Sequence, residues 1–343
     1  MLLSFKIVPV NAVQLLAIGV YLLAILVFAR QIHTRTLAVY LVFQSILMAT
    51  NFAEEALGLR AYYLFTPLFT LTTGPLIYFL FASLLHVQKP PLSKQLLHFL
   101  PVLVVLPFTT YAQQIIVIGT LSQLVYFVMS IRLVLMYQDA SANIRSDVND
   151  LDLAWIKSTL FSFMAFALSD LVRLNMQVYN DPDTKALWYF INLCWLLLLN
   201  FYLIVNVITQ PKLVETLGED ESIQRLSEPS ENPTEIFNII HQTISDQYLY
   251  RQPRLTIHDV AEVIGLSTKD ISWAINTCGG QNFNEYINRL RINEVKQQLK
   301  GGGKSATNVL TLAMNAGFNS KSSFNSVFKK QTGCTPSQFL KLK

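Results

Sequence analysis

The sequence predicts an all-α protein in two parts: a seven-helix transmembrane bundle, then a soluble domain of two helix-turn-helix units joined by a long helix. Three observations support this prediction. Charged residues are sparse up to Thr209, apolar stretches of membrane-spanning length recur in that region, and one short pattern occurs twice after Leu255. The expected boundaries are 1–209 for the membrane part, 210–235 for an acidic linker and 236–343 for the soluble domain.

The amino-acid composition indicates that much of the chain lies in lipid. Of 343 residues, 52% are hydrophobic and 14% are charged, whereas about a quarter of a soluble chain is charged. Up to Thr209 there are 11 Lys+Arg and 9 Asp+Glu, against 15 and 13 in the shorter remainder. The cysteines, Cys194, Cys278 and Cys334, are far apart and in no metal-ligand spacing, so we expect free thiols and no metal site.

Seven apolar stretches, most of them near the length of about 20 residues that a spanning helix needs, form the predicted bundle. The fourth is short and contains Pro101 and Pro107, which predict a kink. No cleavable signal is expected, because Met1–Ala29 runs straight into the first span without a small-residue cleavage pattern. The stretches are Ile7–Ala29, Thr36–Ala53, Tyr62–Leu85, Gln95–Thr110, Gln114–Met136, Leu153–Met176 and Ala186–Ile208.

The distribution of Lys and Arg predicts how the bundle is oriented. With the N-terminus outside, the inner loops and adjoining helix ends contain seven Lys or Arg, and the outer segments contain four. An odd number of spans then places the C-terminal domain in the cytoplasm, where DNA is found. We therefore expect a multi-pass cell-membrane protein, in contact with membrane lipid, with an outer N-terminus and a cytoplasmic C-terminal domain.

Polar residues inside the spans are the candidates for binding a signal. Thr70 and Thr73 lie in a polar patch of the third span, a pattern that lines cavities but also serves simple helix packing. Asp170 and Arg173, three residues apart in the sixth span, can pair with each other or contact a ligand. The pair Glu54–Glu55, at the outer end of the second span, favours a solvated rim.

The linker differs in composition from both of its neighbours. Residues 210–235 contain three prolines and seven acidic residues against Lys212 and Arg225, a net charge of −5. This composition favours a solvated tether that would average about 30 Å from end to end. A helix over Pro211–Leu226 that continues the seventh span is the alternative, and it would transmit movement better.

The pattern that occurs twice after Leu255 has the features of a helix-turn-helix. These are a short helix, a glycine that permits a tight turn, a polar cap, and a second helix with apolar residues four apart. Matched positions are 52 or 53 residues apart. The first copy has Val260-Ala261, Gly265-Leu266-Ser267, Ile271 and Ile275, and the second has Leu312-Ala313, Gly317-Phe318-Asn319, Phe324 and Phe328.

Two such units predict binding to double-stranded DNA. We expect recognition helices over Thr268–Cys278 and Ser320–Gln331, joined by a long helix over Phe283–Leu299. From Ile236 onward there are 13 Lys+Arg and 6 Asp+Glu, a net charge of +7 that suits phosphate binding. A polar helix face is usually only solvated, and Trp273 can instead fold back onto the domain. The candidate DNA-binding residues are Lys269, Ser272, Trp273, Asn276, Lys321, Ser322, Asn325, Ser326 and Lys329.

Several strings in this region match a known family in order and spacing. They are Leu255-Thr256-Ile257, Gly265-Leu266-Ser267, Glu285-Tyr286-Ile287-Asn288, Gly317-Phe318, Phe328-Lys329-Lys330 and Thr335-Pro336. From about Tyr248 to Phe339 the chain resembles the DNA-binding domain of AraC-type transcriptional regulators. Gly74-Pro75-Leu76-Ile77-Tyr78-Phe79 and His98-Phe99-Leu100-Pro101 are similar to multi-span regulators of that family.

The resemblance implies two helix-turn-helix units joined by a long helix, in a regulator at the inner membrane of a bacterium. It also implies which candidate residues read bases, namely Lys269, Ser272, Trp273, Lys321, Ser322, Asn325 and Ser326. The chain departs from the family pattern at Trp273 and Ser326, where a basic residue is common, and Asp270 adds a negative charge to the first recognition helix. These departures predict weaker direct reading of base sequence.

We therefore expect a membrane-anchored transcription regulator that binds promoter DNA sequence-specifically and senses a signal through its spans. RNA polymerase, a second copy of the chain, and a small-molecule or membrane signal are further expected partners. No nucleotide-binding loop or nucleophile–base pair occurs, so we expect neither an enzyme nor a cofactor. Two alternatives stay open: a membrane transporter or enzyme with a basic regulatory tail, although the spans lack an internal repeat, and a structural tether that holds DNA at the membrane.

Overall fold

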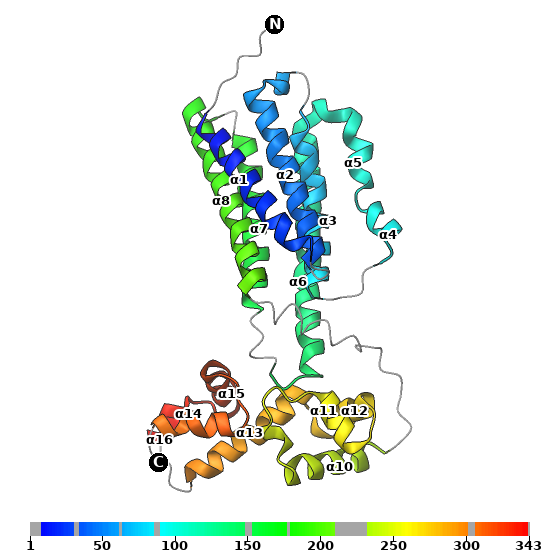
Figure 1. Cartoon of the computed structure of the whole chain (residues 1–343), viewed down its shortest axis with the longest axis vertical. Coiled ribbons are helices and arrows are strands. Elements are labelled where there is room, and N and C mark those ends of the chain that lie inside the picture. The colour runs from blue at the N-terminus through cyan, green and yellow to red at the C-terminus, as the bar shows by residue number, and fades with distance from the viewer. Residues whose placement is uncertain are drawn as a thin grey trace. The chain divides into compact units, whose positions relative to one another are not determined.

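The protein is described from a computed structural model in which it forms two compact units (Figure 1). Unit 1 consists of Met1–Leu135 and Leu153–Glu221, and unit 2 of Met136–Asp152 and Ser222–Lys343. The regular elements of the described residues are helices, with one isolated β-bridge, which confirms the all-α prediction. The structure describes residues 8–30, 34–61, 64–85, 90–147, 153–176, 179–209, 232–300 and 306–341.

Unit 1 is a bundle of long apolar helices. Helix α1 packs against α2 and α8, α2 also packs against α3, and α7 packs against α8. In the described part of the chain, six helical stretches are long and apolar enough to cross a membrane. They are α1 (Pro9–Phe28), α2 (Arg35–Ala56), the short helix η3 (Thr66–Leu68) with α3 (Phe69–Leu84), the stretch Leu92–Ala142, α7 (Ala154–Asn175) and α8 (Pro182–Thr209).

The fourth and fifth predicted spans both lie in the stretch Leu92–Ala142. Pro101 and Pro107 each stand in the first turn of a new helical piece, as expected of a residue that lacks the backbone N–H. The predicted kink is therefore confirmed, and Figure 1 shows α5 and the following α6 running in opposite directions. The number of seven spans stays a prediction. The pieces are α4 (Leu92–Leu97), α5 (Leu100–Val105), η4 (Leu106–Tyr111) and α6 (Ala112–Ala142).

Unit 1 exposes many large apolar side chains, although several polar side chains are buried inside it. Leu23, Leu103 and Leu198 are about two-thirds exposed, at 67%, 67% and 66%. By contrast, the buried Asn200 amide donates to the Tyr21 hydroxyl at 3.1 Å and accepts from the Tyr40 hydroxyl at 2.8 Å. The apolar surface thus faces outward, while polar side chains satisfy one another inside the bundle.

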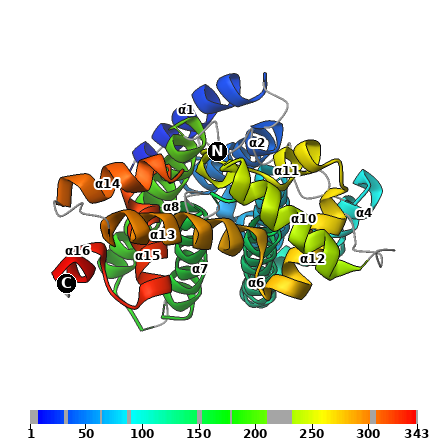
Figure 2. The same cartoon turned by 90° about the horizontal axis from the view of Figure 1, so that it is seen from below.

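Unit 2 contains two apolar cores that share one long helix, α13. Phe283 and Ile287 of this helix belong to the first core, and Ile292 and Val295 belong to the second. Figure 2 shows α13 running from α10 and α12 to α14 and α15, so the predicted long connecting helix is confirmed. The helices are α10 (Pro233–Asp246), η7 (Leu249–Arg251), α11 (Ile257–Ile264), α12 (Thr268–Gly279), α13 (Phe283–Lys300), α14 (Ala306–Asn315), α15 (Lys321–Thr332) and α16 (Pro336–Lys341).

The predicted linker falls almost entirely outside the described residues, which resume at Asn232. The choice between a tether and a helix over Pro211–Leu226 therefore stays a prediction, as do the domain boundaries expected from the sequence. One feature was not expected from the sequence. Residues Met136–Asp152, placed by the sequence within the membrane part, group with unit 2.

Candidate nucleic-acid interface

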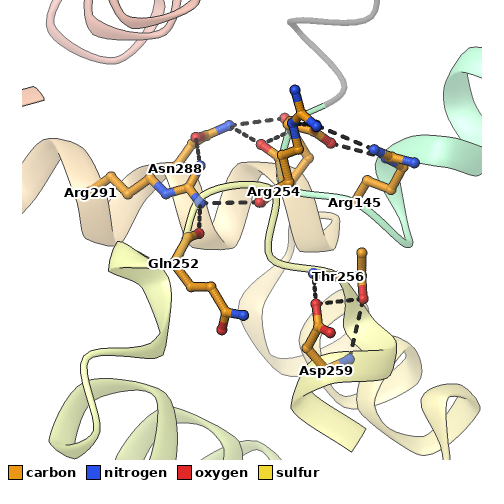
Figure 3. Close-up of polar contacts among 10 residues, drawn as sticks. Arg145, Gln252, Arg254, Thr256, Asp259, Asn288 and Arg291 are labelled. Atoms are coloured by element: carbon orange, nitrogen blue, oxygen red, sulfur yellow. Dashed lines mark hydrogen bonds and ion pairs between the residues drawn. The ribbon is translucent and has the colours of Figure 1, made fainter. Parts of the chain in front are cut away.

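The first helix-turn-helix has the caps and the turn that the sequence predicts. The Thr256 hydroxyl accepts from the Asp259 amide at 3.2 Å, and the Asp259 carboxylate accepts from the Thr256 amide at 2.7 Å, as Figure 3 shows. Gly265 ends α11 with φ +76°, in the left-handed region that glycine adopts readily. The Ser267 hydroxyl then accepts from the Asp270 amide at 3.1 Å and begins α12.

The second helix-turn-helix repeats this geometry, with one additional constraint. The Ser320 hydroxyl accepts from the Ser323 amide at 3.0 Å and caps α15, so this helix begins one residue later than the sequence predicts. Gly317 has φ +100° in the turn, and a Cβ at this position would lie 2.6 Å from the Tyr250 carbonyl oxygen and 2.8 Å from that of Arg251. Gly317 therefore permits both the turn and the close approach of η7, which precedes the first helix-turn-helix unit.

Helix α12 presents the first group of candidate DNA-binding residues. Its inner face buries Ile271, Ala274 and Ile275, as expected. The Asp270 carboxylate accepts from the Ser267 hydroxyl at 2.6 Å, so its negative charge lies at the helix cap. Of the predicted residues, Asn276 is exposed, whereas Lys269, Ser272 and Trp273 are partly buried.

Helix α15 presents the second group on a more open face. Its inner face buries Phe324, Val327 and Phe328, as expected. The Lys330 ammonium donates to the Glu285 carboxylate of α13 at 2.8 Å, so this lysine is tied to the long helix. All five predicted residues of this helix are exposed: Lys321, Ser322, Asn325, Ser326 and Lys329.

Comparisons with known proteins agree with this geometry. Residues 260–342 match a helix-turn-helix domain family. The chain is also similar to the melibiose operon regulatory proteins of Escherichia coli strain K12 and Escherichia coli O6:H1, with 38% identity over 88 residues. The C-terminal part is an AraC-type helix-turn-helix domain. The alignment covers 26% of this chain and 28% of each relative, and no solved structure matches the chain.

Within the AraC-type domain, Arg291 is a structural residue rather than a phosphate contact. Only 1% of it is exposed. Its guanidinium donates to the carbonyl oxygens of Tyr250 at 2.7 Å and Gln252 at 2.9 Å, and it lies 5.7 Å from the centroid of the Phe318 ring. Arg291 therefore connects the loop before the first unit with the core of the second.

Ionisable side chains also connect α13 with α10 and η7. The Arg251 guanidinium lies 2.7 Å from the Glu294 carboxylate, and this hydrogen-bonded pair raises the pKa of Arg251. Burial raises the pKa of Tyr250, with a further contribution from Glu294. Burial also raises the pKa of Tyr286, whose hydroxyl lies 2.8 Å from His241 Nδ1. These contacts join α10 to α13 and η7 to α13.

Unit 1 contains a cavity of about 490 Å³ that all four predicted signal-binding residues line. Arg173 lies 2.7 Å from the Asp170 carboxylate and 5.0 Å from the Tyr189 ring centroid, so the predicted ion pair is present. The Thr70 and Thr73 hydroxyls donate to backbone carbonyls of their own helical segment, at 2.6 and 2.8 Å. The four residues chosen from the sequence thus line one cavity, although the sequence did not indicate that a cavity is present.

The expectation of a solvated rim is wrong for Glu54. This residue is only 5% exposed, and its carboxylate accepts from the Phe65 amide at 2.6 Å and from the Thr66 amide at 2.9 Å. It therefore caps η3 from within the bundle. Glu55 is partly buried, where it accepts from the Gln14 amide at 3.1 Å.

We also searched the described residues for a group of side chains that could bind a metal ion. Within these ranges, no group of three His, Cys, Asp or Glu side chains is placed to hold a metal ion. Cys194, Cys278 and Cys334 are free thiols, as the sequence predicts.

Proposed function

We propose that this chain is a membrane-anchored bacterial transcription regulator that binds promoter DNA through α12 and α15 and senses a signal through unit 1. The observation that supports DNA binding most directly is the repeated helix-turn-helix with a polar, partly or fully exposed face on each second helix. A helix of this kind enters the major groove, and residues in its N-terminal part contact base edges. Lys269 and Lys321 occupy that position in α12 and α15.

Electrostatics would supply most of the binding that is independent of base sequence. Residues 236–343 have a net charge of +7, and Lys321 and Lys329 are exposed on the open face of α15. Each lysine that neutralises a phosphate releases counterions, so affinity falls as salt rises. Ser322, Asn325 and Ser326 on the same face can hydrogen-bond to base edges.

Anchoring in a membrane accounts for the exposed apolar side chains of unit 1. Exposed leucines are favourable against lipid tails, whereas in water such a surface would promote aggregation. Helix α6 has 31 residues and is therefore about 46 Å long, which exceeds the hydrocarbon core of about 30 Å. Its end would project out of the bilayer.

The cavity of unit 1 is the proposed site of the signal. Its volume of about 490 Å³ is within the range of small-molecule sites. Phe127, Phe163 and Phe166 provide apolar wall, and Asp170 and Arg173 provide charge. This combination suits a small amphiphilic molecule with a polar or charged end.

Genome-wide mapping of the DNA bound by the full chain tests the proposed function. The map is repeated with Trp273→Ala and with Lys321→Ala, because each removes one candidate contact from a different recognition helix. We expect lost or shifted sites in both variants. An identical map from both would show that the contact residues are wrong, and the absence of enriched sites for the parent chain would refute DNA binding itself.

A further inference from the structure

The residues that follow α6 pack into the DNA-binding domain. We call residues 143–147 the α6 extension. They precede that domain by about ninety residues in the sequence, yet they group with it in unit 2. α6 ends at Ala142, so the extension follows this helix directly in the sequence.

Backbone hydrogen bonds attach the extension to the start of the first helix-turn-helix. The Ile257 amide donates to the Ile144 carbonyl oxygen at 2.8 Å, and the Ser146 amide donates to the Leu255 carbonyl oxygen at 3.0 Å. Arg145 and Thr256 thereby form an isolated antiparallel β-bridge. Because Thr256 is the cap of α11, the extension fixes the residue from which the first unit begins.

Side chains of the extension complete the interior of the domain. Ile144 is 9% exposed and belongs to the first apolar core. The Ser146 carbonyl oxygen accepts from the Asn284 amide at 2.7 Å and the Asn288 amide at 3.3 Å. The Ser146 hydroxyl accepts from Arg291 at 3.1 Å. Without the extension, these hydrogen-bonding groups of α13 would lose a buried partner.

Charge within the extension is largely neutralised by the extension itself. Arg145 Nε lies 3.0 Å from the Asp147 carboxylate, and both residues are buried. Figure 3 shows Arg145 beside this cluster, with Arg291 and Asn288 on the α13 side. Arg254, from the loop before α11, also lies 4.0 Å from the Asp147 carboxylate, so this carboxylate pairs with one arginine of the extension and one of the DNA-binding domain. A buried ion pair of this kind depends on its geometry, so it favours one docked position.

The extension also reaches the residue that connects the two helix-turn-helix units. Arg291 contacts Ser146, the loop carbonyls of Tyr250 and Gln252, and the Phe318 ring of the second core. Two recognition helices can enter successive segments of the major groove only if their separation is fixed. The position of Arg291 therefore bears on DNA binding without any contact to DNA.

We propose that the α6 extension binds the DNA-binding domain intramolecularly, and that this docking sets the affinity of the domain for DNA. Docked, it fixes the start of α11 and holds Arg291 between the two units; released, it leaves both less ordered and weakens DNA binding. One predicted DNA contact, Asn276, donates to Asn143 at 3.5 Å, but it lies in the last turns of α12. Docking therefore leaves the N-terminal part of α12 accessible.

The same helix provides a route from the cavity to this contact. Ile116, Thr120, Gln123 and Phe127 of α6 line the cavity of unit 1, and the extension follows the last residue of α6 directly in the sequence. In this proposal, a ligand that shifts α6 acts on Ile144 and Ser146 through the chain that joins them to this helix. This route does not require the acidic linker to transmit the signal, and it rests on the proposed DNA-binding function.

Two single substitutions and one control, each made in the full chain and reconstituted in lipid nanodiscs, test the proposal. Asp147→Asn removes the buried ion pair, and Ile144→Ala removes apolar contact from the first core. Asp139→Asn is the matched control, because Asp139 is exposed on α6 and its side chain makes no ion pair among the described residues. Hydrogen exchange at the Ser146 and Ile257 amides reports docking, and fluorescence anisotropy with a labelled duplex from a mapped site reports DNA affinity.

We expect exchange at both amides to accelerate about tenfold in the two test variants, as for a local opening, and Kd to rise about fivefold or more. The control should match the parent chain in both readouts. Unchanged protection of Phe324 and Phe328 amides would show that the second core remains folded. Faster exchange with an unchanged Kd would overturn the proposal, as would unchanged exchange. A parent chain that binds no duplex would instead refute the proposed function.

Discussion

Gly317→Ala tests most sharply how the turn of the second helix-turn-helix unit packs against η7. The turn requires φ +100°, which costs an L-residue roughly 1–2 kcal/mol. The new Cβ would also lie 2.6 Å from the Tyr250 carbonyl oxygen, a backbone atom that cannot rotate away. Overpacking of this kind typically costs about 1–3 kcal/mol, so the total loss is about 2–5 kcal/mol. A domain with a stability of about 5–15 kcal/mol would lose a large part of it.

Gly265→Ala is the matched control for this substitution. Gly265 also has a left-handed φ, +76°, but nothing lies within 4 Å of its added Cβ. Its expected loss is therefore only the backbone cost, about 1–2 kcal/mol. The assay is hydrogen exchange at the α13 and α15 amides of the full chain in nanodiscs, which gives the free energy of opening. Equal losses in the two variants would refute the close approach of Gly317 to the Tyr250 backbone.

Three further predictions follow from single contacts. Lys329→Ala should weaken duplex binding and lower the slope of log affinity against log salt by about one unit. Lys330→Ala should change this slope less, because the Lys330 ammonium is already paired with Glu285. Equal slopes for the two variants in anisotropy titrations would contradict this. Thr256→Ala should destabilise α11 by about 1 kcal/mol in hydrogen exchange, whereas an unchanged value would exclude the cap. Burial raises the pKa of Tyr286, so the unfolded chain loses this proton first; stability should fall as pH rises above about 10, and Tyr286→Phe should reduce that fall in pH-dependent circular dichroism.

Features determined by neighbouring residues in the sequence were predictable. Thr256, Gly265 and Ser267 act on residues close to them in the sequence, so their caps and turn can be predicted from local residue types. In the second unit the repeated pattern indicated a cap at Asn319, one residue before the actual cap, Ser320. The break of the fourth span follows from the missing N–H of proline. The helix α16 escaped prediction, because its six residues are too few for a periodic pattern.

Features determined by distant residues were not predictable. Asn284 and Asn288 resemble ordinary polar positions of α13, yet they bind the carbonyl of Ser146, more than 130 residues earlier. Glu54 stands at a helix end, where solvation is the usual expectation, but the chain returns at Thr66 and buries it. For the same reason, the local turn signal of Gly317 could not indicate that the Tyr250 backbone lies against it.

The most direct test of the central claim is the affinity of the full chain in nanodiscs for duplex DNA, measured across a salt series of about 50 to 200 mM. A duplex from a mapped site is compared with an unrelated duplex of equal length. We predict binding to both in dilute buffer, tighter binding to the mapped site by about a thousandfold, and a linear fall of log affinity with log salt. Failure to bind either duplex in dilute buffer would contradict the proposed function.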